Sequence, residues 1–172
     1  IYLTHMIKKI IFRKIVFHNF ENKDFKRLIN QKKLFLFPSG SGIPLLQKNK
    51  KYYLSLLNAD YVFFDSGFFV ILLRFLKNIK VNKFSGFKFL NLFFKYLSTN
   101  KNKSVFCIDP NPIFLKSNKN YFKKIGVNRT YHYTAPKYNS ENIKDKNLLR
   151  KINKFKPDFI MTNIGGGTQE VL

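Results

Sequence analysis

The feature of this chain that most constrains its fold is a repeated alternation of short apolar runs with longer amphipathic stretches. Runs rich in β-branched and aromatic residues predict strands at 34–37, 61–64, 104–108, 129–133 and 158–162. Helical periodicity predicts helices at 22–31, 43–57, 67–77, 86–98, 111–124 and 140–155, and a further helix start at 166. Such alternation is typical of a mostly parallel sheet with helices on both faces. We therefore predict a Rossmann-like α/β fold.

The length and composition suit one domain with a large core. Of the 172 residues, 45% are hydrophobic and 17% are aromatic, which is enough apolar volume to fill such a core. We expect residues 1–32 to be a basic β/α lead-in of the same domain and residues 33–172 to form its main part. Because the chain starts at Ile1 and stops inside a glycine-rich motif, we expect a fragment truncated at the C-terminus, with Met6 as a candidate start.

The net charge of +23 raises the question of a nucleic-acid partner. Only five of the 32 basic residues are arginines, and the lysines are scattered without a long block. Recognition of bases and phosphates favours the planar fork of arginine, so we predict no nucleic-acid partner. The abundance of Lys, Asn, Ile, Phe and Tyr is typical of an AT-rich genome. The charge also favours attraction to an anionic membrane surface.

Several other classes of protein are disfavoured. Cys107 is the only cysteine, which excludes a disulfide framework and suggests a reducing cytoplasm. The three histidines stand far apart, so we expect no metal site. The most apolar stretch is interrupted by Asp65 and Arg74, which leaves runs shorter than the roughly 20 residues of a spanning helix. We expect no signal peptide, because the N-terminal stretch lacks a small-residue cleavage site.

Turn residues rich in glycine, serine and carboxylate follow the predicted strands. In open parallel sheets, ligands bind outside the carboxyl ends of the strands. The segments there are "PSGSG" at 38–42, "DSG" at 65–67, "DPNP" at 109–112 and "GGGTQE" at 165–170. We expect all four to gather on one edge of one sheet and to form the ligand site.

The glycine triplet is the first candidate binding loop. Backbone N–H groups of Gly165, Gly166 and Gly167, at a helix start, would suit a phosphate. Gln169 and Glu170 could then bond a sugar hydroxyl. The alternative is a flexible turn in which Glu170 only complements the helix N-terminus.

Ser39 and Gly40 belong to a second candidate phosphate loop. The segment lacks the third glycine of a dinucleotide fingerprint, because Leu45 stands there. A Ser/Gly turn that caps the next helix explains this stretch equally well.

Asp65 is the candidate general base. A carboxylate at the ligand edge, desolvated by neighbouring phenylalanines, is suited to accept a proton. A strand-to-helix junction also favours Asp as an N-cap, and the two roles are compatible. Farther along, the stripe of Phe87, Leu90, Phe94 and Leu97 indicates core packing, with a lipid-facing surface as the alternative.

The ordered set of segments resembles the WecG/TagA/CpsF family of bacterial glycosyltransferases. The resemblance covers about residues 33–172 and rests on "LLNADYVFFDSGFFVILLRFL", "KFSGFKFL", "SVFCIDPNP" and "KINKFKPDFIMTNIGGGTQE". Its most specific parts are the spacing from Ala59–Asp60 to Asp65 and the pair Gln169–Glu170.

This resemblance implies an inverting transfer of an N-acetylhexosamine, commonly N-acetylmannosamine, from a UDP-sugar to a polyprenyl-diphosphate-linked sugar. Asp65 matches the family's proposed base, and Lys83 stands where members usually have Arg. Ser39 falls at the Asn of a Thr-x-Asn segment, and the donor-site loop matches Gly165, Gln169 and Glu170. The sequence departs from the family pattern at Phe37, Ser66, the "IDPNP" segment and the Gly167–Thr168 pair.

The leading hypothesis is therefore a glycosyltransferase of cell-surface polysaccharide synthesis, cytoplasmic and peripheral at the inner face of the plasma membrane. No Asp-x-Asp pair occurs in the sequence, so we expect no cofactor and no metal requirement. Two alternatives stay open. One is a basic α/β nucleic-acid-binding domain, and the other is a different nucleotide-dependent Rossmann-type enzyme.

Overall fold

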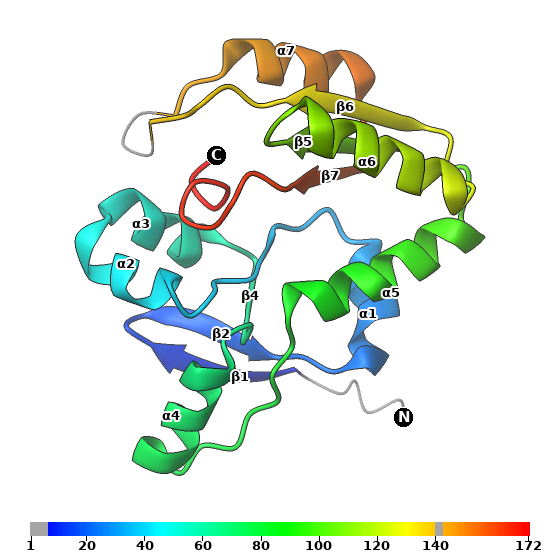
Figure 1. The fold of residues 1–172 in the computed structure, drawn as a ribbon. Coiled ribbons are helices and arrows are strands. Elements are labelled where there is room, and N and C mark those ends of the chain that lie inside the picture. The colour runs from blue at the N-terminus through cyan, green and yellow to red at the C-terminus, as the bar shows by residue number, and fades with distance from the viewer. Residues whose placement is uncertain (1–6, 140–142) are drawn as a thin grey trace. The chain divides into compact units, whose positions relative to one another are not determined.

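The computed structural model describes residues 7–139 and 143–172 (Figure 1). The chain forms two compact units, Ile1–Leu92 and Phe93–Leu172. Each unit combines helices with a sheet that is mostly or wholly parallel, which confirms the predicted Rossmann-like α/β class. The expectation that all the strands lie in one sheet is wrong, because the strands divide between two sheets.

The first unit contains a four-stranded sheet with the strand order β1-β2-β4-β3. Its strands are β1 (Lys8–Phe12), β2 (Ile15–Asn19), β3 (Phe35–Leu36) and β4 (Tyr61–Phe63). Its helical elements are η1 (Asn22–Asp24), α1 (Phe25–Ile29), α2 (Gly42–Lys48), α3 (Lys50–Asn58) and α4 (Gly67–Lys77). The β2–β4 and β3–β4 pairs are parallel. The predicted β/α lead-in contains the antiparallel β1–β2 hairpin, which turns at Arg13 and Lys14 with φ values of 49° and 65°.

Aromatic rings fill the core of the first unit. Phe17 of β2 stacks on Phe64, which follows β4, with ring centroids 5.1 Å apart. Phe20 meets Phe84 edge-on at 4.3 Å. All four rings are at most 1% exposed, so they fix the segment around residue 84 against the sheet. This contact positions Lys83, the neighbour of Phe84, beside the ends of the strands.

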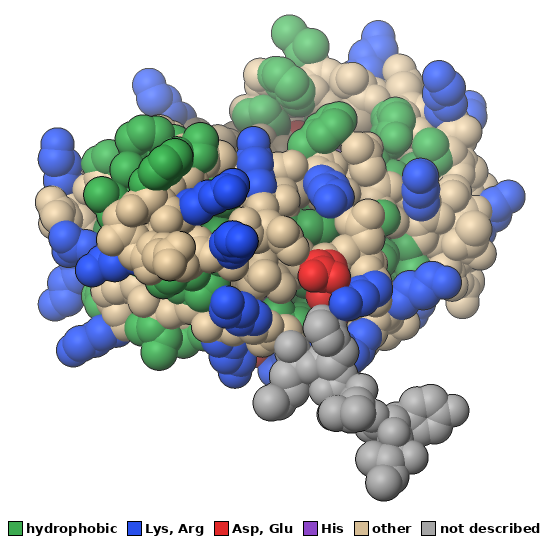
Figure 2. Space-filling model, turned by 90° about the horizontal axis from the view of Figure 1, so that it is seen from below, with side chains coloured by type: hydrophobic (Ala, Val, Ile, Leu, Met, Phe, Trp, Pro, Cys, Tyr) green, Lys and Arg blue, Asp and Glu red, His purple; other side chains and the backbone are tan. Residues whose placement is uncertain are grey.

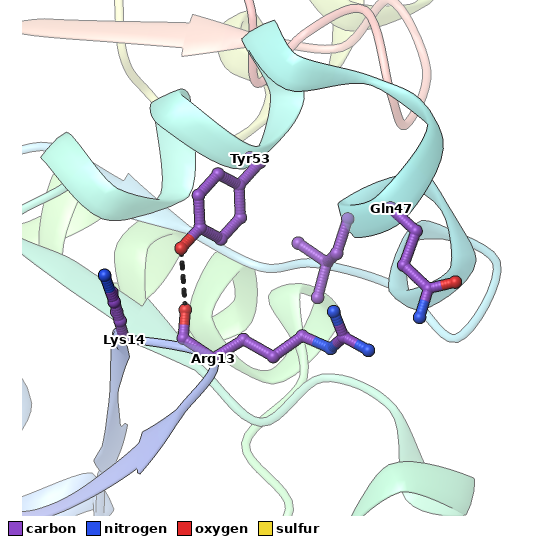
Figure 3. Close-up of a pocket in the computed structure, with 5 residues that line it drawn as sticks. Arg13, Lys14, Gln47 and Tyr53 are labelled. Atoms are coloured by element: carbon purple, nitrogen blue, oxygen red, sulfur yellow. Dashed lines mark hydrogen bonds between the residues drawn. The ribbon is translucent and has the colours of Figure 1, made fainter.

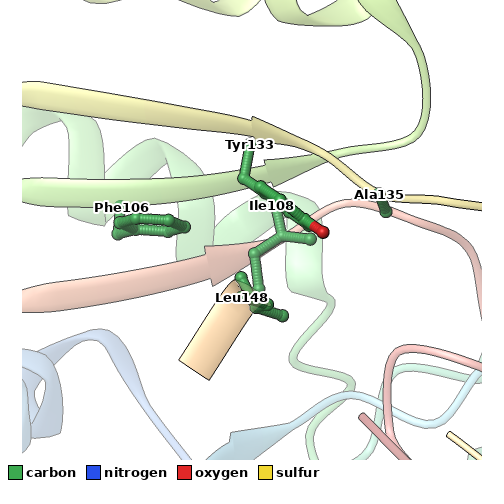
Figure 4. Packing of buried hydrophobic residues seen from close by; sticks show 5 residues of the cluster. All are labelled: Phe106, Ile108, Tyr133, Ala135 and Leu148. Atoms are coloured by element: carbon green, nitrogen blue, oxygen red, sulfur yellow. The ribbon is translucent and has the colours of Figure 1, made fainter. Parts of the chain in front are cut away.

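The second unit contains a parallel sheet with the order β6-β5-β7. Its strands are β5 (Val105–Asp109), β6 (Thr130–Thr134) and β7 (Phe159–Thr162), and its helices are α6 (Pro112–Lys124) and α7 (Lys146–Phe155). Every residue of the central strand β5 is buried, as expected for a strand paired on both edges and covered on its faces. A cluster on this sheet consists of Phe106, Ile108, Tyr133, Ala135 and Leu148 (Figure 4).

Helix α5 (Gly86–Thr99) contains the boundary between the units. Of its residues, Phe93 and Leu97 are buried, at 5% and 0% exposure, and Phe87 is 75% exposed. The predicted stripe is therefore core for Leu97 but not for Phe87. The buried line is offset because Phe89, Phe93 and Leu97, spaced by four residues, share the packed side of the helix.

The predicted helices agree with the structure except at their junctions. Helix α4 has the predicted bounds of 67–77. The predicted helix at 43–57 breaks at Asn49, whose extended backbone ends α2 and whose side chain caps α3 by accepting from Tyr52 N–H at 3.0 Å. The predicted start at 140 lies outside the described residues, and α7 begins at Lys146 after the cap Asp145.

The predicted helix start at 166 is wrong. Residues 166–171 form turns, in which Gln169 N–H donates to the Gly165 carbonyl at 3.1 Å. Gly165 and Gly167 have φ values of 101° and 88°, which a right-handed helix does not allow. These angles explain why glycine is needed at the two positions.

Candidate active site

The first unit brings two of the four predicted segments together, "PSGSG" and "DSG". Because β3 and β4 are parallel neighbours, the segments after them leave the sheet at the same edge. Gly40, after β3, lies so close to Ser66, after β4, that a Cβ at Gly40 would be 3.1 Å from Ser66 Oγ. Ser39 completes the first loop, and its hydroxyl lies 2.9 Å from that of Ser41.

Asp65 occupies the centre of this edge. Its Oδ1 accepts a hydrogen bond from Gly86 N–H at 2.9 Å, and its side chain is half-buried. Gly86 is the first residue of α5, so the carboxylate lies at the N-terminus of that helix, where the helix dipole favours an anion. Oδ2 accepts no hydrogen bond from the part of the chain that the structure describes.

The N-cap interpretation of Asp65 needs a correction. Ser66, and not Asp65, caps the following helix α4, because its Oγ accepts from Phe69 N–H at 3.2 Å. Asp65 instead bonds the start of α5, which lies 21 residues farther along the chain. The role of Ser66 was missed although its cap is local and Ser is a preferred N-cap residue. The role of Gly86 could not be found, because local capping patterns do not indicate which distant helix a side chain will reach.

Lys83 lies at the same edge. A Cβ at Gly67 would be 3.6 Å from Lys83 Nζ, which places the ammonium beside the first residue of α4. The Lys83 side chain is exposed, and its ammonium makes no ion pair within the described residues. Lys83 also lines a hollow of about 470 Å³ together with Lys88 and the Glu21–Lys23 ion pair. The arrangement leaves a positive charge available to an anionic ligand.

The second unit contains the glycine loop, which follows β7. Around Gly165 the space is open, since an added Cβ would have no other heavy atom within 4 Å. Gly167 N–H donates to Glu170 Oε2 at 2.6 Å, and Glu170 is only 7% exposed. Burial raises the pKa of Glu170, although hydrogen bonds from the loop backbone oppose the rise. The Glu170 carboxylate therefore accepts the hydrogen bond of one of the three amides that were expected to bind phosphate.

This geometry favours the structural role of Glu170 within the loop. The amides of Gly165 and Gly166 are those that remain for an anion, since the Gln169 side chain is itself hydrogen-bonded to the Glu170 carboxylate. The prediction that this loop and Asp65 form one site stays a prediction, because the two lie in separate units.

Asp109, at the end of β5, is structural in this arrangement. Its side chain is 0% exposed and accepts from Asn118 Nδ2 at 2.6 Å, with His132 Nδ1 at 2.9 Å from the other oxygen. Burial alone raises the pKa of Asp109, but the bonds with His132 and Asn118 outweigh it and lower the pKa. The "DPNP" segment therefore contributes no free carboxylate to a ligand.

A further hollow in the first unit contains none of the predicted site residues. Its volume is about 550 Å³, and it is lined by Arg13, Lys14, Leu46, Gln47 and Tyr53 (Figure 3). The Tyr53 hydroxyl donates to the Arg13 carbonyl at 2.9 Å, which ties α3 to the β1–β2 turn. No sequence motif pointed to this hollow.

Residues 7–139 and 143–172 contain neither a metal-ligating cluster nor a helix that could span a membrane. No group of three or more His, Cys, Asp and Glu side chains there is placed to hold a metal ion. None of the helices there combines the length and apolarity needed to cross a lipid bilayer.

Comparison with known proteins adds one match. The family model described as "Glycosyl transferase WecG/TagA/CpsF family" matches residues 10–172. No curated protein matches the chain. The family match covers both units and includes every residue of the candidate site.

Proposed function

Because the chain belongs to the WecG/TagA/CpsF family of glycosyltransferases, we propose that it transfers a ManNAc-like N-acetylhexosamine from a UDP-sugar. The proposed acceptor is a polyprenyl-diphosphate-linked sugar, and the product is an intermediate of a cell-surface polysaccharide. The proposed location is cytoplasmic, at the inner face of the plasma membrane.

The observation that carries the chemistry is the state of the Asp65 carboxylate. Oδ1 is fixed by Gly86 N–H at 2.9 Å, and Oδ2 is left without a partner among the described residues. A general base needs a fixed orientation and one oxygen free to accept a proton. Asp65 meets both requirements.

The proposed reaction is a single displacement with inversion. Asp65 Oδ2 takes the proton of the acceptor hydroxyl while the acceptor oxygen forms a bond to the anomeric carbon. The bond from that carbon to the UDP oxygen breaks, and its electron pair leaves with UDP. Lys83 would stabilise the charge that develops on the diphosphate.

The binding roles follow the same division. Gly165, Gly166 and Gln169 would contact the donor, while Gly167 and Glu170 would hold the loop in shape through their 2.6 Å bond. Ser39 and Gly40 would contact the substrate at the Asp65 edge. No step of this proposal uses a metal ion.

The test is the variant Asp65→Asn, with Asp60→Asn as its control. The two carboxylates flank the same strand, β4, but Asp60 bonds Lys33 Nζ at 2.8 Å and Leu34 N–H at 2.9 Å and has a structural role. With a labelled UDP-N-acetylhexosamine and a lipid-linked acceptor, we expect kcat to fall by about 10²–10⁴-fold in Asp65→Asn. Asp60→Asn should keep its kcat.

UDP binding, measured by calorimetry, should survive in Asp65→Asn because the base faces the acceptor. Near-normal transfer by a folded Asp65→Asn protein would make Asp65 structural and would contradict the mechanism. Steeply salt-dependent RNA binding without affinity for UDP would favour the nucleic-acid alternative instead.

A further inference from the structure

Helix α4 presents large apolar side chains to solvent. Phe68, Ile71 and Phe75 are 69%, 52% and 81% exposed, and Leu76 is 73% exposed. Spaced by three and four residues, the first three lie along one face of the helix. This exposed α4 face, defined by these four residues, is unusual because soluble proteins rarely expose such contiguous apolar groups.

The opposite side of α4 is anchored in the first unit. Phe69 and Leu73 are 5% and 6% exposed. The centroid of the Phe69 ring lies 5.0 Å from that of Phe12 and 5.4 Å from that of Phe17. The helix is therefore packed firmly by one face, so that the exposure of the other face is not the result of a loose segment.

The charge around this face is positive. Arg74 and Lys77 lie in the last turn of α4, Lys80 follows, and all three are exposed. The sequence has no Asp or Glu between Asp65 and Asp109. Figure 2 views the molecule from the side on which α4 lies and shows hydrophobic and basic side chains interspersed, with few acidic ones.

The acidic residues of the first unit do not neutralise this charge. Apart from Asp65, they form ion pairs elsewhere: Glu21 with Lys23, Asp24 with Arg27 and Asp60 with Lys33. Helices that lie in the interface of an anionic bilayer have exposed Phe, Ile and Leu side chains, which insert, and surrounding lysines and arginines, which attract the anionic headgroups.

We propose that α4 is a membrane-docking element and that its exposed face inserts into the headgroup region of a bilayer containing anionic phospholipid. The helix has 11 residues, about 16 Å of length, which suits a helix lying in the plane of the interface. The inference deepens the proposed function and rests on it for the identity of the lipid-linked acceptor.

Docking through α4 would also place the reacting groups. Ser66 caps α4, and Asp65 directly precedes that cap. A bilayer at the exposed face therefore holds the candidate base within a short distance of the headgroup region. A sugar attached to a lipid diphosphate emerges from the bilayer at this level, so that the acceptor reaches Asp65 while its lipid tail stays in the membrane.

The chain contains no tryptophan, which allows a direct test. Phe75→Trp puts a single fluorophore on the exposed α4 face. The control Phe114→Trp puts one on α6, where Phe114 is 55% exposed. With phosphatidylcholine vesicles that contain phosphatidylglycerol, we expect a blue shift and quenching by brominated acyl chains in Phe75→Trp only.

Sedimentation with the same vesicles gives the size of the effect. The double variant Phe75→Ser/Leu76→Ser should lower the partition coefficient by at least about tenfold, because two large apolar groups no longer insert. The matched variant Ile113→Ser/Phe114→Ser on α6 should change it by less than about twofold. Arg74→Gln/Lys77→Gln should weaken binding to anionic vesicles and leave binding to neutral vesicles unchanged.

Three results would overturn the proposal. The first is equal quenching in both tryptophan variants, and the second is an unchanged partition coefficient in Phe75→Ser/Leu76→Ser. The third is that the unsubstituted protein self-associates in the absence of vesicles and that Phe75→Ser/Leu76→Ser abolishes this self-association. The last result would mean that a second copy covers the face. Failure of the proposed function is distinguishable, because UDP binding is measured without vesicles and the docking tests need no transfer reaction.

Discussion

Asp158 offers a quantitative test of how the second unit positions its glycine loop. It precedes β7, the strand that leads into the loop, and binds the residues that precede β5. Its carboxylate accepts from Ser104 N–H and Ser104 Oγ at 2.8 Å each, and from Lys103 Nζ at 3.0 Å. We predict that Asp158→Asn destabilises the second unit and loosens the start of β7.

The magnitude follows from the pKa of Asp158. Burial alone would raise this pKa, but the hydrogen bonds from Ser104 and Lys103 outweigh burial and lower it from 3.8 to about 2. At 1.36 kcal/mol per pH unit, the upper limit of the stabilisation is about 2.5 kcal/mol. Since the side chain is 34% exposed, solvent screening reduces the contribution to about 1–1.5 kcal/mol.

The pH dependence has a definite sign. A lowered carboxyl pKa stabilises the folded state above the unfolded-state pKa of roughly 3.9, and the contribution disappears as the pH falls through about 2. Urea unfolding at neutral pH should therefore show a loss of about 1–1.5 kcal/mol in Asp158→Asn. The difference from the unsubstituted protein should shrink steadily between roughly pH 4 and pH 2.

Lys103→Gln serves as the matched variant, because it removes one of the three donors and keeps the carboxylate. Its loss of stability should be smaller than that of Asp158→Asn. A stability difference for Asp158→Asn that stays constant with pH, or that is absent at neutral pH, would refute the electrostatic argument.

Two further predictions concern the second unit. Gly166→Val should weaken UDP binding, measured by calorimetry, without lowering the stability of the protein; unchanged affinity for UDP would remove the loop from the donor site. Gly165→Ala should lower the free energy of unfolding by about 1–3 kcal/mol, because the φ of Gly165 is 101°. Burial and the charge of Asp109 raise the pKa of the Cys107 thiol, which is 0% exposed, so a maleimide should label it only in urea. Rapid labelling of the folded protein would contradict this packing.

The strands from residue 34 onward and most helices could be predicted because each leaves a local pattern. The apolar run around Val62 and the spacing of apolar residues in the helix beginning at Gly67 are both visible in the sequence. The division into two sheets leaves no such pattern, because periodicity shows which side chains are buried and not which strand lies beside them. The break at Asn49 was missed because neither Gly nor Pro marks it; a single side-chain cap separates the two helices.

The residues of the candidate site could be predicted from the sequence, but the residues that they contact could not. Asp65 and the loop containing Gly40 could be located from the rule that ligands bind at strand ends. Their partners could not be located, since the bond from Gly86 to Asp65 joins residues 21 positions apart. The bond from Gly167 to Glu170 is local, and it was foreseen only as the alternative interpretation of the loop.

The close approach of Gly40 to Ser66 has a consequence for the history of the sequence. The Ser66 hydroxyl caps α4 and also fills the space that a side chain at position 40 would need. A side chain at 40 requires the Ser66 hydroxyl to give way by a few tenths of an ångström, which weakens its cap on α4, and complete loss of such a cap costs about 1 kcal/mol. Substitutions at the two positions should therefore occur together among related chains, together with a compensating cap for α4.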